Sequence, residues 1–439
     1  MKLFFKRLVF VLALALPSVH LQCMDSSQAL IPETSHIVDI KEFIHRMLSL
    51  PPDIKRLIIC LIFQLDEATA PQLFSGEPKV LTFPSSLLTI AMNPHRNTLF
   101  IQLSDDNQPF LFNLQSKEKL SLGSSSVICS ASFSPDNTMA IAGTVKGSAL
   151  IWNVEKGTLL STLTGHTNLI PSVVLSPDNL TALTGSNDTT ACLWNVHDGK
   201  LLHTLQGHKA GVSCVAFSPN NSTAATGSHD SKVCLWNVHE GTLLHTLQGH
   251  TDGICIVQFS PDGRTLLTGS RDGRACLWNA RDGKLLHTLK EHTKGLVQAK
   301  FFPDGKTILT ACYGNIVCLW HAETGVQLCI LNKNPQEQGF LGAADFSPQG
   351  ETIATAMRNE EIHLWDSAGH QLCTLKSPSR YFGWVLFSSD GKALIAGSHA
   401  GTDNCICIWT KFPWSSTTVK ELFWKYCFLL KSQQVNEQQ

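Results

Sequence analysis

The chain has 439 residues, a formal net charge of -1, 43% hydrophobic residues and 16% charged residues. This hydrophobic content permits a large buried core and excludes a disordered chain. The near-zero net charge lacks the basic surplus that nucleic-acid binding requires, so no nucleic-acid partner is expected.

Residues 1–23 have the features of a secretory signal peptide. Lys2, Lys6 and Arg7 form a basic start. The apolar run Leu8–Leu16 that follows is far shorter than the roughly 20 residues that a membrane-spanning helix needs. We therefore expect a secreted or periplasmic protein with no membrane span in the mature chain. A buried N-terminal helix in a cytoplasmic protein, or in one delivered to a host cytoplasm, is the alternative.

Residues 24–76 are expected to form a helical lead segment. Apolar residues follow helical spacing from Ile37 to Leu48 and again from Ile54 to Leu61, with Pro-Pro-Asp at the start of the second stretch. Residues 50–62 resemble the opening of an F-box, the short helical module that docks receptors onto a ubiquitin ligase. A helical hairpin packed against the next domain is the other interpretation.

A repeat of 42 residues dominates the middle of the chain. Residues 167–208 and 209–250 share 25 of 42 positions without a gap. In four copies a Gly-His or Glu-His pair ends 28 residues before a tryptophan. The tryptophans of the repeat are Trp152, Trp194, Trp236, Trp278, Trp320, Trp365 and Trp409, and Phe112 takes this place in a degenerate first copy. Such a period indicates supersecondary units that stack on one another.

Each unit reads as four short strands. In residues 209–250 they are expected at Val212–Phe217, Thr223–Ser228, Val233–Trp236 and Leu243–Leu247, separated by turn residues. Four antiparallel strands per unit, repeated radially, predict a propeller blade.

The repeat resembles the WD-repeat family over residues 78–410, although most copies read Trp-Asn where the family has Trp-Asp. The resemblance implies an all-β propeller. Eight units predict eight four-stranded antiparallel blades, and seven blades with a degenerate first unit is the alternative. Lys79–Phe83 is expected to complete the last blade and so to close the ring.

The resemblance also implies a buried hydrogen-bond chain in each blade, made by a His, a strand Ser or Thr, a turn Asp and the Trp. The positions matched to this structural tetrad are His166, Ser186, Asp188 and Trp194; His208, Ser228, Asp230 and Trp236; and His250, Ser270, Asp272 and Trp278. Because the His-Ser-Asp trio recurs three times, each time tied to a Trp, we interpret it as structural and not as a hydrolase triad.

Fifteen cysteines are present, an odd number. Five of them lie two residues before a repeat tryptophan: Cys192, Cys234, Cys276, Cys318 and Cys407. One cysteine per unit cannot pair within its unit, so these are expected to be small buried residues and not a disulfide framework. No zinc-ligand spacing accompanies them, and we expect no metal or other cofactor.

Residues 411–439 are expected to form an amphipathic helix with a polar tail. Thr418 and Glu421 make a capping-box pattern, and apolar residues from Val419 to Leu430 form a stripe along the helix.

No Walker loop, dinucleotide fingerprint or nucleophile elbow is found, so the protein is expected not to be an enzyme. We expect a scaffold, monomeric within a larger assembly, that binds a protein or peptide on the top face of the propeller. The residue seven before each Trp varies in chemistry, and in WD repeats its turn opens on that face. The partner-binding candidates are Arg271, Tyr313, Arg358, His229 and Asn187. Because Arg suits carboxylates, the partner segment is expected to be acidic. An F-box-like receptor acting in a host cell and a propeller enzyme are the alternatives.

Overall fold

The computed structural model describes residues 78–410, apart from residues 84, 86, 94–97, 106–107, 115, 315, 332–340, 358–360, 377–381, 389 and 398–404. Residues Gly76–Thr410 form one compact unit. The predicted signal peptide, the 24–76 segment with its F-box-like stretch and the 411–439 helix lie outside the described residues. Within the described part, no helix is long and apolar enough to cross a membrane.

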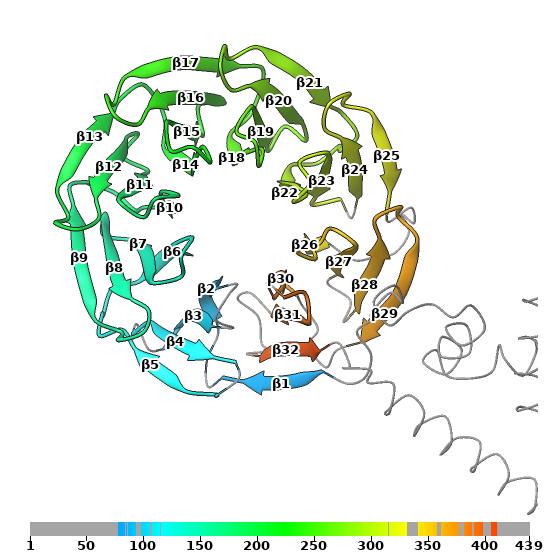
Figure 1. Cartoon of the computed structure of the whole chain (residues 1–439), viewed down its shortest axis with the longest axis horizontal. Helices are drawn as coiled ribbons and strands as arrows, with labels where there is room; N and C mark the ends of the chain where they lie inside the picture. The colour runs from blue at the N-terminus through cyan, green and yellow to red at the C-terminus, as the bar shows by residue number, and fades with distance from the viewer. Residues whose placement is uncertain are drawn as a thin grey trace, which may run out of the picture. The chain divides into compact units, whose positions relative to one another are not determined.

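The strands of the described residues pair into eight four-stranded antiparallel sheets arranged around a common centre (Figure 1). The eight-bladed propeller predicted from the repeats is confirmed, and the seven-bladed alternative is wrong. We number the blades 1 to 8 along the chain and call the strands of each blade a, innermost, to d, outermost.

The strands of the first four blades have the following bounds. Blade 1 contains β2 Leu87–Asn93, β3 Thr98–Leu103, β4 Phe110–Asn113 and β5 Lys119–Ser121. Blade 2 contains β6 Ile128–Phe133, β7 Met139–Thr144, β8 Ser148–Asn153 and β9 Leu159–Thr164. Blade 3 contains β10 Ser172–Leu175, β11 Thr181–Gly185, β12 Ala191–Asn195 and β13 Leu201–Leu205. Blade 4 contains β14 Val212–Phe217, β15 Thr223–Ser228, β16 Lys232–Asn237 and β17 Leu243–Gln248.

The other four blades complete the ring. Blade 5 contains β18 Ile254–Phe259, β19 Thr265–Ser270, β20 Ala275–Asn279 and β21 Leu285–Leu289. Blade 6 contains β22 Leu296–Phe301, β23 Thr307–Cys312, β24 Val317–His321 and β25 Gln327–Ile330. Blade 7 contains β26 Leu341–Phe346, β27 Thr352–Met357, β28 Glu361–Asp366 and β29 Gln371–Lys376. Blade 8 contains β30 Trp384–Phe387, β31 Ala393–Gly397, β32 Cys405–Thr410 and β1 Lys79–Thr82.

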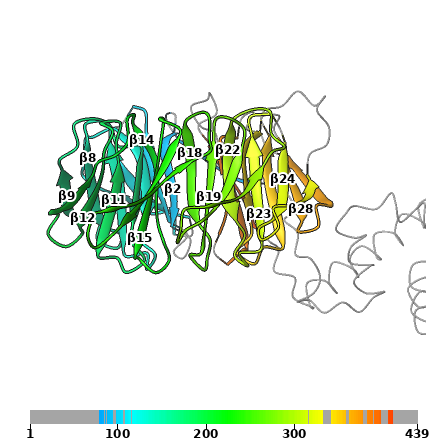
Figure 2. The same cartoon turned by 90° about the horizontal axis from the view of Figure 1, so that it is seen from above.

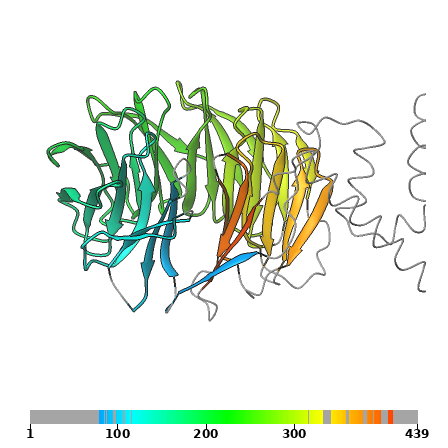
Figure 3. The same ribbon diagram turned by 60° about the horizontal axis from the view of Figure 1, so that its bottom comes forward.

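The ring closes through β1, which is strand d of blade 8. β1 pairs antiparallel with β32, with Lys79 opposite Ile408 and Thr82 opposite Cys405. Figure 3 shows this blue strand crossing beside the orange-red β32. The closing strand was predicted from Lys79–Phe83. Without it, β32 would present a row of unpaired backbone groups.

The hydrophobic core lies between neighbouring blades, which stack side by side (Figure 2). Leu235 and Leu247 of blade 4 share one cluster with Ile254 and Trp278 of blade 5. Close stacking requires small residues on strand b: a Cβ added to Gly227 would lie 2.6 Å from the Ile254 side chain. Each blade therefore buries its faces only against its neighbours.

The cysteines of strand c are packing residues. Cys192, Cys234, Cys276 and Cys318 are buried and form no disulfide, as the sequence predicted. Burial raises the pKa of the Cys192, Cys234 and Cys276 thiols to about 11, so they are protonated and unreactive at neutral pH.

The antiparallel blades give the ring two faces. The b–c turns and the d–a loops lie on one, the top face, and the a–b and c–d turns lie on the other, the bottom face. The a–b turn has the same hydrogen bonds in blades 2 to 5. In blade 4, Ser218 Oγ donates to Asn220 Oδ1 at 2.7 Å and accepts from the Thr223 amide at 3.0 Å. Asn221 has a φ of 58°, and Gly263 takes this left-handed position in blade 5 with a φ of 71°.

Candidate binding surface

A buried hydrogen-bond chain crosses blades 3, 4 and 5 at equivalent positions. In blade 4 the Trp236 indole N–H donates to Thr226 Oγ1 at 2.8 Å, and the same hydroxyl lies 2.8 Å from His208 Nε2. The other ring nitrogen of His208 lies 3.1 Å from Asp230 Oδ2. The chain joins the d–a loop, strands b and c and the b–c turn, and so holds the top of the blade rigid.

The hydroxyl in this chain belongs to a threonine, and the predicted serines are not members of it. The linking residues are Thr184, Thr226 and Thr268. The predicted serines lie two positions further along strand b: Ser186, Ser228 and Ser270. Because side chains alternate along a strand, both positions share a face, but only the threonine is level with the indole. Ser228 Oγ instead donates to the Ala210 carbonyl at 2.9 Å and accepts from the Asp230 amide at 3.1 Å.

The carboxylate at the end of the chain is strongly stabilised. Burial acts to raise the pKa of Asp188, but hydrogen bonds from Thr190, Thr167 and His166 outweigh it and lower this pKa to about 2. His166 Nδ1 lies 2.8 Å from Asp188 Oδ2. The contacts therefore run from the Trp194 indole at one end to a fixed carboxylate at the other, which is a structural arrangement.

Blades 2, 6 and 8 are among the blades that lack parts of this hydrogen-bond chain. In blade 6, His292 Nε2 lies 2.7 Å from Thr310 Oγ1, but Gly314 replaces the Asp, and His292 Nδ1 has no partner among the described residues. Burial lowers the pKa of His292 to about 4. In blade 2 the Trp152 indole donates to the Leu122 carbonyl instead. In blade 8 the Trp409 indole N–H is buried without a partner within the described part of the chain.

A second periodic bridge was not found from the sequence. A histidine on strand d contacts a backbone carbonyl in the c–d turn of the next blade. The distances from Nε2 to the carbonyl oxygen are 2.9 Å for His203 and His239, 3.0 Å for His245 and Arg281, and 2.8 Å for His287 and Glu323. Since the partners are carbonyl oxygens, the histidines donate. The pentapeptide Leu-Leu-His-Thr-Leu, which begins at residues 201, 243 and 285, was the available signal.

The predicted binding residues occupy one turn in consecutive blades. Asn187, His229, Arg271 and Tyr313 follow strand b in blades 3, 4, 5 and 6 and therefore lie on the top face. Tyr313 is 51% exposed, Arg271 and His229 are exposed, and Asn187 is half-buried. Arg358 lies outside the described residues, so the structure does not place it.

The backbone beneath these side chains is fixed. The amides of His229, Arg271 and Tyr313 donate to the carbonyls of Gly211, Gly253 and Gly295, at 3.0, 3.0 and 3.1 Å. A Cβ added to Gly295 would lie 3.1 Å from Arg271 Cα. The loop that enters blade 6 therefore favours glycine where it packs against the b–c turn of blade 5. The variable side chains thus project from a framework that is the same in each blade.

The surroundings of Arg271 and Tyr313 are mainly basic. The other charged residues in or beside the adjoining loops and turns of blades 4 to 6 are Lys209, Lys232, Arg274, Lys290, Lys294, Asp252 and Glu291, besides the aspartates held by histidines. Burial raises the pKa of the nearby Cys255 thiol to about 11, while the charge of Arg271 acts in the opposite direction. Around Arg271 and Tyr313, the Lys and Arg side chains outnumber the carboxylates that are not held by histidines, which favours an acidic partner.

The fold and the buried chains define a β-propeller whose repeats place the same framework in each blade. The sequence family described as WD domain, G-beta repeat matches residues 116–153, 157–195, 199–237, 241–279 and 283–321. The chain therefore contains five repeats of the WD-repeat family. Propellers of the family are typically protein-interaction scaffolds and are generally non-catalytic. In the described part of the chain, no group of three or more His, Cys, Asp or Glu side chains could hold a metal ion.

Among solved structures, a crystal structure of the computationally designed Ika8 protein is similar, with 20% sequence identity and a TM-score of 0.65. The match covers 76% of this chain and 100% of the designed chain. At this identity it supports the fold alone. No curated protein matches the sequence.

Proposed function

We propose that the protein is a non-catalytic binding platform that holds an acidic peptide segment of a protein partner across the top face of blades 4 to 7. The observation that carries the proposal is the contrast within the repeat. Strands and turns are copied through blades 3 to 6, whereas the residue seven before the Trp changes from half-buried Asn187 to exposed His229, Arg271 and Tyr313. Variation at an exposed position on a fixed framework favours recognition over folding.

The chemistry of these residues defines the partner. Arg forms bidentate hydrogen bonds with carboxylates, and Arg and Tyr are enriched among residues that dominate binding energy. Arg358 belongs to the proposed site by its position in the repeat. We expect the partner segment to place an Asp or Glu against Arg271 and an apolar residue against Tyr313.

The proposal is tested by selecting binders from a displayed random peptide library with the full protein. Acidic sequences should be enriched. The triple variant Arg271→Ala, Tyr313→Ala, Arg358→Ala should lose roughly 30-fold or more in affinity, as removal of a main binding residue does. A variant with Lys200→Ala and Lys306→Ala, two cations of bottom-face turns, is the matched control and should bind as the unmodified protein does. No enrichment, or equal loss in the control, would contradict the proposal.

We also propose that residues 1–23 direct export, so that the platform acts outside the cytoplasm of its own cell. The basic start and the short apolar run support this. N-terminal sequencing of the purified protein should find residues 1–23 removed. An intact Met1 together with co-purification of a ubiquitin-ligase adaptor would favour the F-box-like receptor instead.

A further inference from the structure

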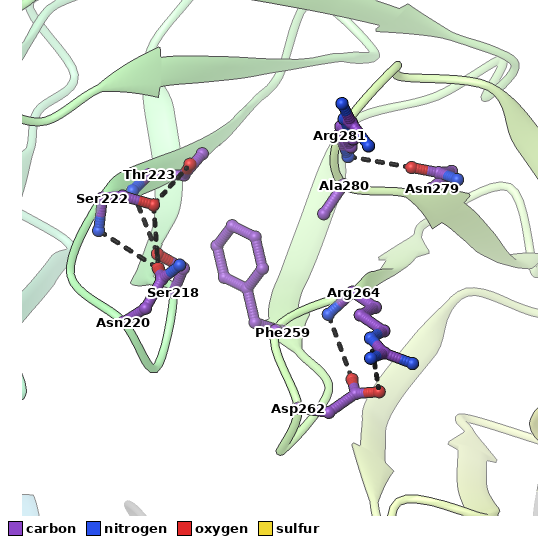
Figure 4. Close-up of a pocket in the computed structure, with 11 residues that line it drawn as sticks. Ser218, Asn220, Ser222, Thr223, Phe259, Asp262, Arg264, Asn279, Ala280 and Arg281 are labelled. Carbon is purple, nitrogen blue, oxygen red and sulfur yellow. Dashed lines mark hydrogen bonds and ion pairs between the residues drawn. The ribbon is translucent and has the colours of Figure 1, made fainter.

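A pocket opens on the bottom face between blades 4 and 5, away from the proposed peptide site. Its volume is about 490 Å³, which falls within the range of roughly 300–1,000 Å³ typical of small-molecule sites. One wall is the a–b turn of blade 4, and the other is formed by the a–b and c–d turns of blade 5. Phe259 lies between the two walls (Figure 4).

The pocket coincides with a change in the repeat. The residue two after the Trp is a buried valine in blades 2, 3 and 4: Val154, Val196 and Val238. In blade 5 it is Ala280, which lines the pocket and is partly exposed. Loss of two methyl groups beside Phe259 leaves an apolar recess between the turns, and the next repeat shares this alanine as Ala322.

The charge of the pocket differs from that of the equivalent places in the two neighbouring interfaces. Its lining contains Arg264, Arg281 and Asp262, which leaves one net positive charge. The positions 42 residues earlier contain Asp178 and no Lys or Arg, so one net negative charge remains there with histidine neutral.

The positions 42 residues later contain three carboxylates and two cations, which again leaves one net negative charge: Asp262, Asp304, Glu323, Arg264 and Lys306. Relative to the preceding interface, Arg264 and Arg281 stand where that interface has Ser222 and His239, and the exchanges at the two aspartate positions cancel. Relative to the following interface, Arg281 stands where Glu323 is found, which alone changes the net charge by two.

Hydrogen bonds fix the turns that carry Arg264, Arg281 and Asn220, whose side chains can donate hydrogen bonds. The Arg281 amide donates to Asn279 Oδ1 at 2.9 Å, and its carbonyl accepts from His245 at 3.0 Å. The Arg264 amide donates to Asp262 Oδ1 at 3.0 Å. On the opposite wall, the Asn220 side-chain oxygen accepts from Ser218 and Ser222 at 2.7 and 2.8 Å. With that oxygen occupied, the wall offers the Asn220 amide group as a donor.

From this geometry we propose that the pocket binds a small organic anion. Its carboxylate or phosphate group lies between Arg264 and Arg281, and its apolar body packs on Phe259 and Ala280. A planar guanidinium suits both anionic groups, so the same donors serve either source.

The test uses the full protein and three probes: phenylacetate, phenyl phosphate and neutral 2-phenylethanol, each titrated by ligand-observed NMR. At least one anionic probe should bind, and the neutral probe should bind about tenfold more weakly or not at all. The stronger anion then identifies carboxylate or phosphate as the natural group. Absence of binding by both anions, or equal binding of all three probes, overturns the proposal.

Two variants locate the site. Ala280→Val restores the residue of the three preceding blades, so it should fill the recess and abolish binding while leaving the melting temperature unchanged. Arg264→Ala with Arg281→Ala should weaken anion binding about tenfold. The matched control removes two lysines from the same kinds of bottom-face turn, Lys306→Ala with Lys200→Ala, and should bind as the unmodified protein does. Unchanged binding in Ala280→Val, or equal loss in the control, overturns the assignment.

Discussion

Replacing Thr226 by valine tests the corrected hydrogen-bond chain most sharply. Valine keeps the shape of the side chain but removes the one oxygen that serves both the Trp236 indole and His208 Nε2. Both residues are buried, and among the described residues neither the indole nitrogen nor His208 Nε2 has another hydrogen-bond partner. Since an unsatisfied buried donor or acceptor costs about 1–3 kcal/mol, two of them should destabilise blade 4 by about 2–5 kcal/mol. The matched control is Ser228→Ala, which removes the serine predicted from the sequence and should cost about 1 kcal/mol.

Thermal unfolding followed by near-UV circular dichroism measures the difference. For a ring of this size, 1 kcal/mol corresponds to a shift of about 1–2 °C, so Thr226→Val should lower Tm by about 2–10 °C and Ser228→Ala by about 2 °C or less. Hydrogen exchange should place the loss in blade 4. The reasoning is refuted if Ser228→Ala is as damaging as Thr226→Val, because the serine would then be the linking residue.

Three further predictions concern the remaining blades. Because the pKa of Asp188 falls to about 2 on folding, its contribution of about 2 kcal/mol should be present above pH 4 and lost as pH falls toward 2. In Asp188→Asn, the unfolding free energy measured with urea should depend less on pH between pH 4 and pH 2. Gly314→Asp should restore a partner for His292, add about 1–2 kcal/mol and raise the pKa of that histidine from about 4. If the His292 pKa measured by NMR titration is the same in Gly314→Asp as in the unmodified protein, the restored contact is absent. Deleting residues 1–85 removes β1 and should cause aggregation in light scattering, whereas deleting 1–70 should not.

The architecture could be predicted because each unit repeats its own signals. The alternation of short apolar runs with Ser-Pro-Asn or Ser-Pro-Asp turns placed the strands of residues 209–250 within one residue of the bounds of β14 to β17. Ring closure followed from counting strands, because the last unit lacked a fourth strand and Lys79–Phe83 was unassigned.

Contacts that join side chains from different strands or blades could not be predicted, because no local sequence pattern encodes them. Thr226 and Ser228 lie on the same face of one strand, so spacing alone cannot tell which hydroxyl is level with the indole. The His245 bridge joins two blades through a backbone carbonyl, which has no sequence signature. The pocket beside Phe259 depends on Ala280 in one blade facing a turn of another, and only the assembled ring brings them together.

The central claim is that this ring recognises a partner through the variable turns of its top face. Hydrogen–deuterium exchange of the full protein, with and without the most enriched acidic peptide, tests it directly. Bound peptide should slow exchange in the b–c turns around His229, Arg271 and Tyr313 and leave the bottom-face turns unchanged. Slower exchange confined to the bottom-face turns or to the outer strands would contradict the claim.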